Sequence, residues 1–196
     1  RCTIGAQLTL SGTGQAVFKV TRNILVTTGA GGSVVDGNLA LNAHFTGDAL
    51  AENFTAIELR GTLSSIGAGD IHVHGRGAAG AAEVVGVWLQ DGAVTGSGAG
   101  MVVIEGGMAA ASSTRSIGLY LVNSEVTAAG ELWVTGTAGA GVALIPGEMA
   151  SVGVLMEQSS LIEGTSGERM SITGTGAAVT ATGSSFGTFI TGSTVS

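Results

Sequence analysis

Apolar and polar residues alternate in short runs along the chain. In residues 131–135, Leu132 and Val134 fall on one side, and Trp133 and Thr135 fall on the other. Alternation with a period of two indicates a β-strand with one buried face. A second kind of run, residues 85–90, alternates in the same way. No long amphipathic stretch with helix caps interrupts these runs, so we predict an all-β protein.

The alternating runs recur at a nearly constant spacing. Relatives of the run ELWVTGT begin near residues 6, 37, 69, 100, 130 and 167, at intervals of 31, 32, 31, 30 and 37 residues. Each unit also holds a second strand and a shorter third strand, and Gly, Ser, Asn and Asp stand between them. A unit of about 30 residues cannot bury its apolar face alone, whereas stacked copies can.

We therefore predict a right-handed parallel β-helix of about six rungs, with three short strands per rung, over residues 1–196 as one domain. We expect the apolar side chains of each strand type to point inward and stack from rung to rung. The first strands form one inward ladder, which holds Leu8/Leu10, Leu39/Leu41, Ile71/Val73, Val102/Ile104, Leu132/Val134 and Met170/Ile172. Part of a second ladder holds Val87/Leu89, Leu119/Leu121 and Val154/Met156, and the third, shorter strand carries one apolar anchor, which is Val94, Val126 or Ile162.

The glycines of GELWVTGTAGAG allow two interpretations. A phosphate-binding loop needs a strand, a glycine turn and then a helix, but here another strand follows each time. We therefore interpret Gly136, Gly139 and Gly141 as a corner and expect no nucleotide cofactor. The same corner is expected at Gly12/Gly14, Gly75/Gly77, Gly106/Gly107 and Gly174/Gly176.

Composition narrows the function. Glycine makes up 35 of 196 residues, more than twice its usual share of about 7%. The net charge of −7 argues against nucleic acid and anionic membrane surfaces as partners, and no apolar window is long enough to cross a bilayer. Cys2 is the single cysteine, so no internal disulfide can form. The chain opens with Arg1 and carries no signal-peptide layout, so we expect a processed chain or a segment of a longer fibre.

Three outward aromatic residues form a possible contact surface. Trp88 and Tyr120 would pair in neighbouring rungs, and Trp133 would lie beside Val103. Exposed aromatic rings can stack on sugars, and exposed apolar patches mark contacts. The alternative, which we favour, is that a loop or a neighbouring protomer covers them.

Histidine and acidic residues offer weaker candidates. His72 and His74 face outward on one strand, and Glu105 lies beside His74. These side chains could hold a metal, but we favour the interpretation that they belong to a solvated outer face. His44 has no obvious partner. An acidic column of Glu131, Glu168 and Asp70 could bind Ca²⁺, although solubilising charge is the favoured interpretation. The remaining acidic turn residues are Asp36, Asp48 and Asp91.

No grouping supports catalysis, so we expect no catalytic, cofactor or metal site and no enzyme. Asn53 opens a glycosylation triplet of a kind common by chance. Thr9, Thr135 and Thr173 would align as in an ice-binding face, but His72 and Val103 interrupt the column. The segment between the first and second strands of each unit varies most in length. In the fifth unit it covers residues 137–150 and carries Pro146, and Val142 and Leu144 there imitate a second strand, which leaves the register of residues 130–166 open.

The phrases LTLSGTG, LWVTGTAG, MSITGTG, GLYLVNSEVTAAG and GVWLQDGAVTGSG resemble the repeats of filamentous-haemagglutinin-like adhesins, exoproteins of two-partner secretion. The resemblance implies a secreted, elongated stalk at the cell surface, used in adhesion or biofilm. We expect a structural fibre that stacks end to end or continues into a longer chain, with host or matrix glycans as ligands. The alternatives are a carbohydrate-active β-helix enzyme, or a glycan-binding surface without turnover.

Overall fold

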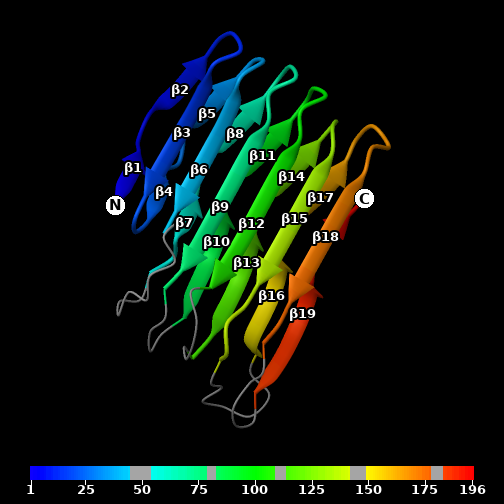
Figure 1. Cartoon of the computed structure of the whole chain (residues 1–196). Helices are drawn as coiled ribbons and strands as arrows, with labels where there is room; N and C mark the ends of the chain where they lie inside the picture. The colour runs from blue at the N-terminus through cyan, green and yellow to red at the C-terminus, as the bar shows by residue number, and fades with distance from the viewer. Residues whose placement is uncertain (45–53, 79–82, 109–113, 142–148, 178–182) are drawn as a thin grey trace.

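The protein is a parallel β-solenoid. The computed structural model describes residues 1–44, 54–78, 83–108, 114–141, 149–177 and 183–196. Its strands form three parallel sheets, A, B and C, and each turn of the chain contributes one strand to each sheet in that order. In Figure 1 the chain runs down sheet C in front and up sheets A and B behind while advancing from N to C, which is a right-handed winding. All-β architecture with three strands per rung is confirmed.

Described strands make six complete rungs and two strands of a seventh. Sheet A holds β1 (Cys2–Ile4), β4 (Ile24–Val26), β7 (Ile57–Leu59), β10 (Val84–Gln90), β13 (Ser116–Val122), β16 (Met149–Glu157) and β19 (Ser184–Ile190). Sheet B holds β2 (Gln7–Leu10), β5 (Gly31–Val34), β8 (Thr62–Ser65), β11 (Ala93–Gly96), β14 (Glu125–Ala128), β17 (Leu161–Gly164) and β20 (Thr194–Val195). Sheet C holds β3 (Gln15–Val20), β6 (Asn38–Ala43), β9 (Ile71–Gly77), β12 (Val102–Met108), β15 (Leu132–Thr137) and β18 (Met170–Thr175).

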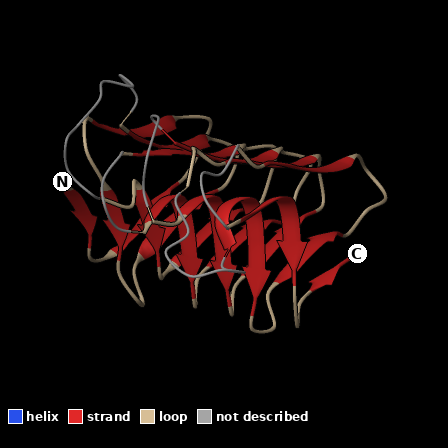
Figure 2. Ribbon diagram, turned by 90° about the horizontal axis from the view of Figure 1, so that it is seen from below, coloured by secondary structure: helices blue, strands red, loops and turns tan. Residues whose placement is uncertain are grey.

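The strands of each sheet stack side by side along the rod (Figure 2). From the second rung onward, the residues predicted to stack inward are paired between neighbouring strands. Sheet C aligns the predicted pairs from Leu39/Leu41 to Met170/Ile172. Sheet A aligns Val87, Leu119 and Val154, and sheet B aligns Val94, Val126 and Ile162. Most of these side chains are buried in one core that runs through the stack, which explains why no rung could fold alone.

The first repeat unit was assigned wrongly. Leu8 and Leu10 lie on β2 in sheet B, where β2 pairs with β5, and not on the sheet C ladder. Ala16 and Phe18 of β3 take the first places on that ladder. The corner from β3 to β4 spans only residues 21–23, so the first turn is short, and Gln15 pairs with Asn38 only 23 residues later.

Interpreting the glycines as corner residues was also wrong for most of them. Gly75, Gly106, Gly136 and Gly174 are paired neighbours inside the strands of sheet C. A Cβ placed on Gly106 would lie 2.0 Å from the carbonyl oxygen of Gly118 in sheet A. These glycines therefore form a ladder where the backbones of sheets A and C are in contact. Among the described elements, the next one after each of these glycines is a strand, as predicted.

Serine hydroxyls tie the rungs together at the corner between sheets A and B. The Ser124 hydroxyl accepts a hydrogen bond from Gly92 N at 3.3 Å, and the Ser160 hydroxyl accepts one from Ser124 N at 3.3 Å. Asp91 and Asn123 hold positive φ of 53° and 47° at this corner, and the Asn123 amide donates to Asp91 at 2.7 Å. Asn and Asp tolerate a positive φ, which explains why these residues stand at this corner.

Within the described ranges, no helix is long and apolar enough to cross a lipid bilayer.

Candidate functional site

Outward side chains of sheet C form columns that cross the rungs. One column runs through Lys19, Asn42, His74, Glu105, Thr135 and Thr173. The neighbouring column, two residues earlier, runs through Val17, Ala40, His72, Val103, Trp133 and Ser171. The inward residues of these strands repeat, whereas the outward ones change from rung to rung. Any chemistry specific to one place on the rod therefore lies in the outward columns.

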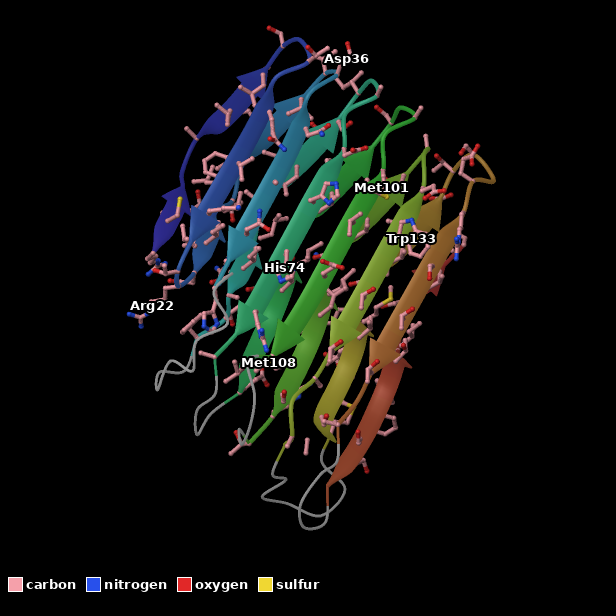
Figure 3. All side chains as sticks on the ribbon, in the orientation of Figure 1. Arg22, Asp36, His74, Met101, Met108 and Trp133 are labelled. Atoms are coloured by element: carbon pink, nitrogen blue, oxygen red, sulfur yellow. The ribbon has the colours of Figure 1, made fainter. Side chains whose placement is uncertain are left out.

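A shallow depression of about 300 Å³ lies on this face, where β9, β12 and β15 run together. Its lining residues are His74, Arg76, Glu105, Gly106, Gly107, Met108, Thr135 and Thr137. Figure 3 shows His74 on β9 and Met108 at the end of the neighbouring strand β12 in sheet C. Gly107 is paired with Arg76, and a Cβ added to it would meet nothing within 4 Å. The missing side chain at Gly107 leaves a gap in the surface of the sheet.

Polar groups of both hydrogen-bonding types line the depression. His74 Nδ1 lies 3.0 Å from Glu105 Oε2, and both side chains are about half exposed, so their attraction is screened by water. Arg76 Nε donates to the carbonyl oxygen of Met108 at 3.3 Å, which anchors the guanidinium. Among the described residues, Arg76 makes no ion pair with a carboxylate. Its remaining N–H donors are therefore available to an anion.

Trp133 lies beside Val103 on sheet C, as predicted. The Arg169 guanidinium sits 4.3 Å from the centre of its ring, and Trp133 Nε1 donates to Glu131 Oε2 at 3.0 Å. A cation already covers one face of the indole, a favourable arrangement in its own right. Trp133 therefore has only one ring face left for stacking.

Trp88 and Tyr120 form the predicted pair on the outer face of sheet A. Their rings stack 5.8 Å apart at 10°, and the Tyr120 hydroxyl donates to Glu157 Oε2 at 2.7 Å. Both rings pack against a second, smaller apolar cluster made by Val85, Ile117, Val152, Leu155, Met149, Phe186 and Phe189. Burial, together with the hydrogen bond to Glu157, raises the pKa of Tyr120 to about 12. These aromatic side chains are therefore partly buried against that cluster.

His44 is an interior residue, contrary to the expectation that it had no partner. It is fully buried with a positive φ of 53°, and its Nδ1 lies 2.8 Å from the carbonyl oxygen of Arg76. Its ring also meets Phe54 edge to face at 5.5 Å. His44 thus supports the strand end that carries Arg76.

The predicted acidic column is out of register by one residue. Leu132 pairs with Met170, so Glu131 stands opposite Arg169, and Glu168 comes one place earlier. Asp70 instead accepts a hydrogen bond from Met101 N at 2.8 Å. Asp36 likewise accepts one from Ala68 N at 3.2 Å. These carboxylates bind main-chain donors at corners, and the described part of the chain gathers no group of three His, Cys, Asp or Glu side chains that could hold a metal.

The threonine column was also assigned wrongly in part. Thr135 and Thr173 are neighbours, but Thr9 lies in sheet B, and the residues that interrupt the column are His74 and Glu105. Asp48, Asn53 and the segment 142–148 lie outside the described residues. The depression was not predicted from the sequence. Its signal there is an outward arginine, Arg76 in GDIHVHGRG, that falls beside an outward glycine, Gly107 in GMVVIEGG of the next unit.

Comparison with protein-family models, with curated proteins and with solved structures finds no match.

Proposed function

We propose that this chain is a structural, non-enzymatic rod: the stalk of a secreted cell-surface adhesin, or a subunit of an extracellular fibre. One observation carries the proposal, namely that a single apolar core extends through the stacked rungs while parallel ladders connect each rung to the next. In such a stack each rung contacts only its neighbours, so length can be added without changing the cross-section. The adhesin repeats that the sequence resembles support the extracellular setting.

The two ends of the described stack present surfaces that either a continuing chain or a second copy would cover. Ile190 and Val195 are 43% and 38% exposed, although they pair with the buried Met156 and Ile162 of the rung below. Among the described strands, none pairs with the outer edge of β18 or of β3. Edge strands that expose main-chain donors and acceptors favour the addition of a further strand.

The charges at the two ends are complementary. Residues 1–35 carry Arg1, Lys19 and Arg22 and no acidic residue. Residues 157–196 carry three glutamates and one arginine. A basic end attracts an acidic end, and this attraction weakens as salt rises. We propose that the N-terminal end of one copy docks on the C-terminal end of another.

Mass measurement in solution, with electron microscopy, tests this proposal. We expect rods longer than one copy at low salt, and shorter ones at high salt. The double variant Ile190→Lys/Val195→Lys should abolish growth, whereas Ile66→Lys, on a residue that is 59% exposed in a middle rung, should not. A compact monomer at every salt and protein concentration would rule out the stacking. Labelling of intact cells with an antibody against the rod tests the extracellular location.

A further inference from the structure

We propose that the depression around Gly107 binds a carboxylate-bearing sugar, a uronate residue of an acidic polysaccharide. The inference goes beyond the proposed rod and does not depend on end-to-end association, since a single copy carries the whole depression. Four features carry it: the volume, the anchored arginine, the mixture of donors and acceptors, and the open shape.

The volume selects a small ligand. Ligand pockets range from roughly 300 to 1,000 Å³, and this depression lies at the lower limit with about 300 Å³. The main chain at Gly106 and Gly107 lines it, and the missing outward side chain of Gly107 leaves the space open. A single sugar ring or a molecule of similar size therefore suits the space.

The charge selects a carboxylate. Arg76 is held by its Nε at the Met108 carbonyl, which leaves the two terminal nitrogens with their N–H donors. Guanidinium and carboxylate pair through two parallel hydrogen bonds, a geometry that a fixed arginine favours. Among the described residues Glu105 makes its close contact with His74, Oε2 lying 3.0 Å from Nδ1, and forms no ion pair with Arg76.

Hydroxyl groups on the ligand match the rest of the lining. Thr135 and Thr137 both donate and accept hydrogen bonds, and Glu105 accepts them. An apolar ligand would leave these groups without partners, at a cost. A simple carboxylate such as acetate would use only the arginine. A hydroxylated ring with one carboxylate uses the whole set.

The depression also favours binding over hydrolysis. Most glycosidases use a pair of carboxylic acids on either side of the bond that they cleave. Of the described residues, Glu105 alone brings a carboxylate to this depression. Because the depression lies on an open sheet face, a polymer can cross it and leave again unchanged.

Gly107 offers a clean test. A valine at this position would fill the depression, and its Cβ would meet nothing within 4 Å, so the strand should fold normally. Gly14→Val is the matched control, because a Cβ there also meets nothing within 4 Å and lies in the first turn, outside the lining residues. Arg76→Gln removes the cation and leaves a shorter, neutral N–H donor. Circular dichroism of each variant checks the fold.

Titration of the 196-residue chain with tri-galacturonate at pH 7 is the experiment, measured by calorimetry and by the NMR signals of the His74 ring. We expect binding in the millimolar range that weakens at least about tenfold in Gly107→Val and in Arg76→Gln, and is unchanged in Gly14→Val. The neutral methyl ester and acetate should both bind about tenfold more weakly. Failure of wild type to bind, equal binding of the methyl ester, equal binding of acetate, or equal binding by Gly107→Val would each overturn the proposal.

Discussion

Adjacent glycines on β12 provide a sharp test of how sheets A and C are packed. Gly106 points inward and Gly107 points outward, so alanine at the two positions adds the same methyl group to opposite faces of one strand. At Gly106 the new Cβ would lie 2.0 Å from the Gly118 carbonyl oxygen, a main-chain atom of a central strand. At Gly107 it would meet nothing within 4 Å. The chain therefore contains its own control.

The size of the effect follows from these distances. Non-bonded heavy atoms pack best near roughly 3.5 Å, so the two sheets would have to separate by about 1.5 Å around Gly106→Ala. A gap of about 1 Å already removes a quarter to a half of each dispersion contact. Overpacking costs about 1–3 kcal/mol, and we expect the upper end, because a strand carbonyl cannot rotate away. Gly107→Ala should instead stabilise the protein by a few tenths of a kcal/mol, about 0.4 or more, by restricting the unfolded chain.

Urea unfolding followed by far-ultraviolet circular dichroism measures both variants. With a slope of about 2 kcal/mol per molar urea, Gly106→Ala should unfold about 1.5 M earlier than wild type. Gly107→Ala should unfold at the wild-type midpoint or slightly above it. If the two midpoints agree within about 0.3 M, the close contact of sheets A and C is wrong.

Three further predictions test other parts of the molecule. Tyr120 is the only tyrosine in the chain, so absorbance at 295 nm reports its ionisation directly. We expect its ionisation midpoint near pH 12 in the folded protein and near pH 10 in guanidinium. In folded Glu157→Gln the midpoint should be lower than in folded wild type. Because the folded pKa is the higher one, this residue's contribution to stability is complete below pH 10 and is lost as the pH rises towards 12, and an unchanged urea midpoint over that interval would contradict the assignment. Ser124→Ala should lower the free energy of unfolding by about 1–3 kcal/mol, since Gly92 N loses its acceptor, and a loss below about 0.5 kcal/mol would show that water replaces it. Leu119→Ala in a fully buried central position should cost about 2–5 kcal/mol by thermal or urea unfolding, and a smaller loss would contradict the continuous core.

The rung architecture could be predicted because the inward side chains of each strand have one dominant requirement, which is to be buried. An apolar pair two residues apart, such as Leu132 and Val134, recurs from unit to unit. Stacking the units is the only way to bury these pairs. The same logic gave the pairing of Trp88 with Tyr120 and of Trp133 with Val103. The inward ladders and these aromatic neighbours were thus predicted correctly in the regular rungs, whereas the acidic and threonine columns were placed out of register.

Prediction failed where two segments satisfied the same pattern. Residues 7–10 alternate like a sheet C strand and precede the next unit by the usual interval, yet the short corner at residues 21–23 shifts them into sheet B. The inward glycines could not be distinguished from turn glycines either. A turn and a close approach between sheets both require a small residue, and only the three-dimensional contact between Gly106 and Gly118 separates the two causes.

The depression around Gly107 follows from the same division of the rung into two faces. Inward positions must repeat, because each side chain packs on its equivalent in the next turn, and a change there is felt by two neighbouring rungs. Outward positions carry no such constraint, so one rung can present Arg76, the next Gly107 and the third Thr137 without disturbing the core. A bare glycine between two long or polar neighbours then creates a recess on an otherwise flat sheet. On a rod of this kind a binding site needs no special loop, because a single outward residue smaller than its neighbours is enough.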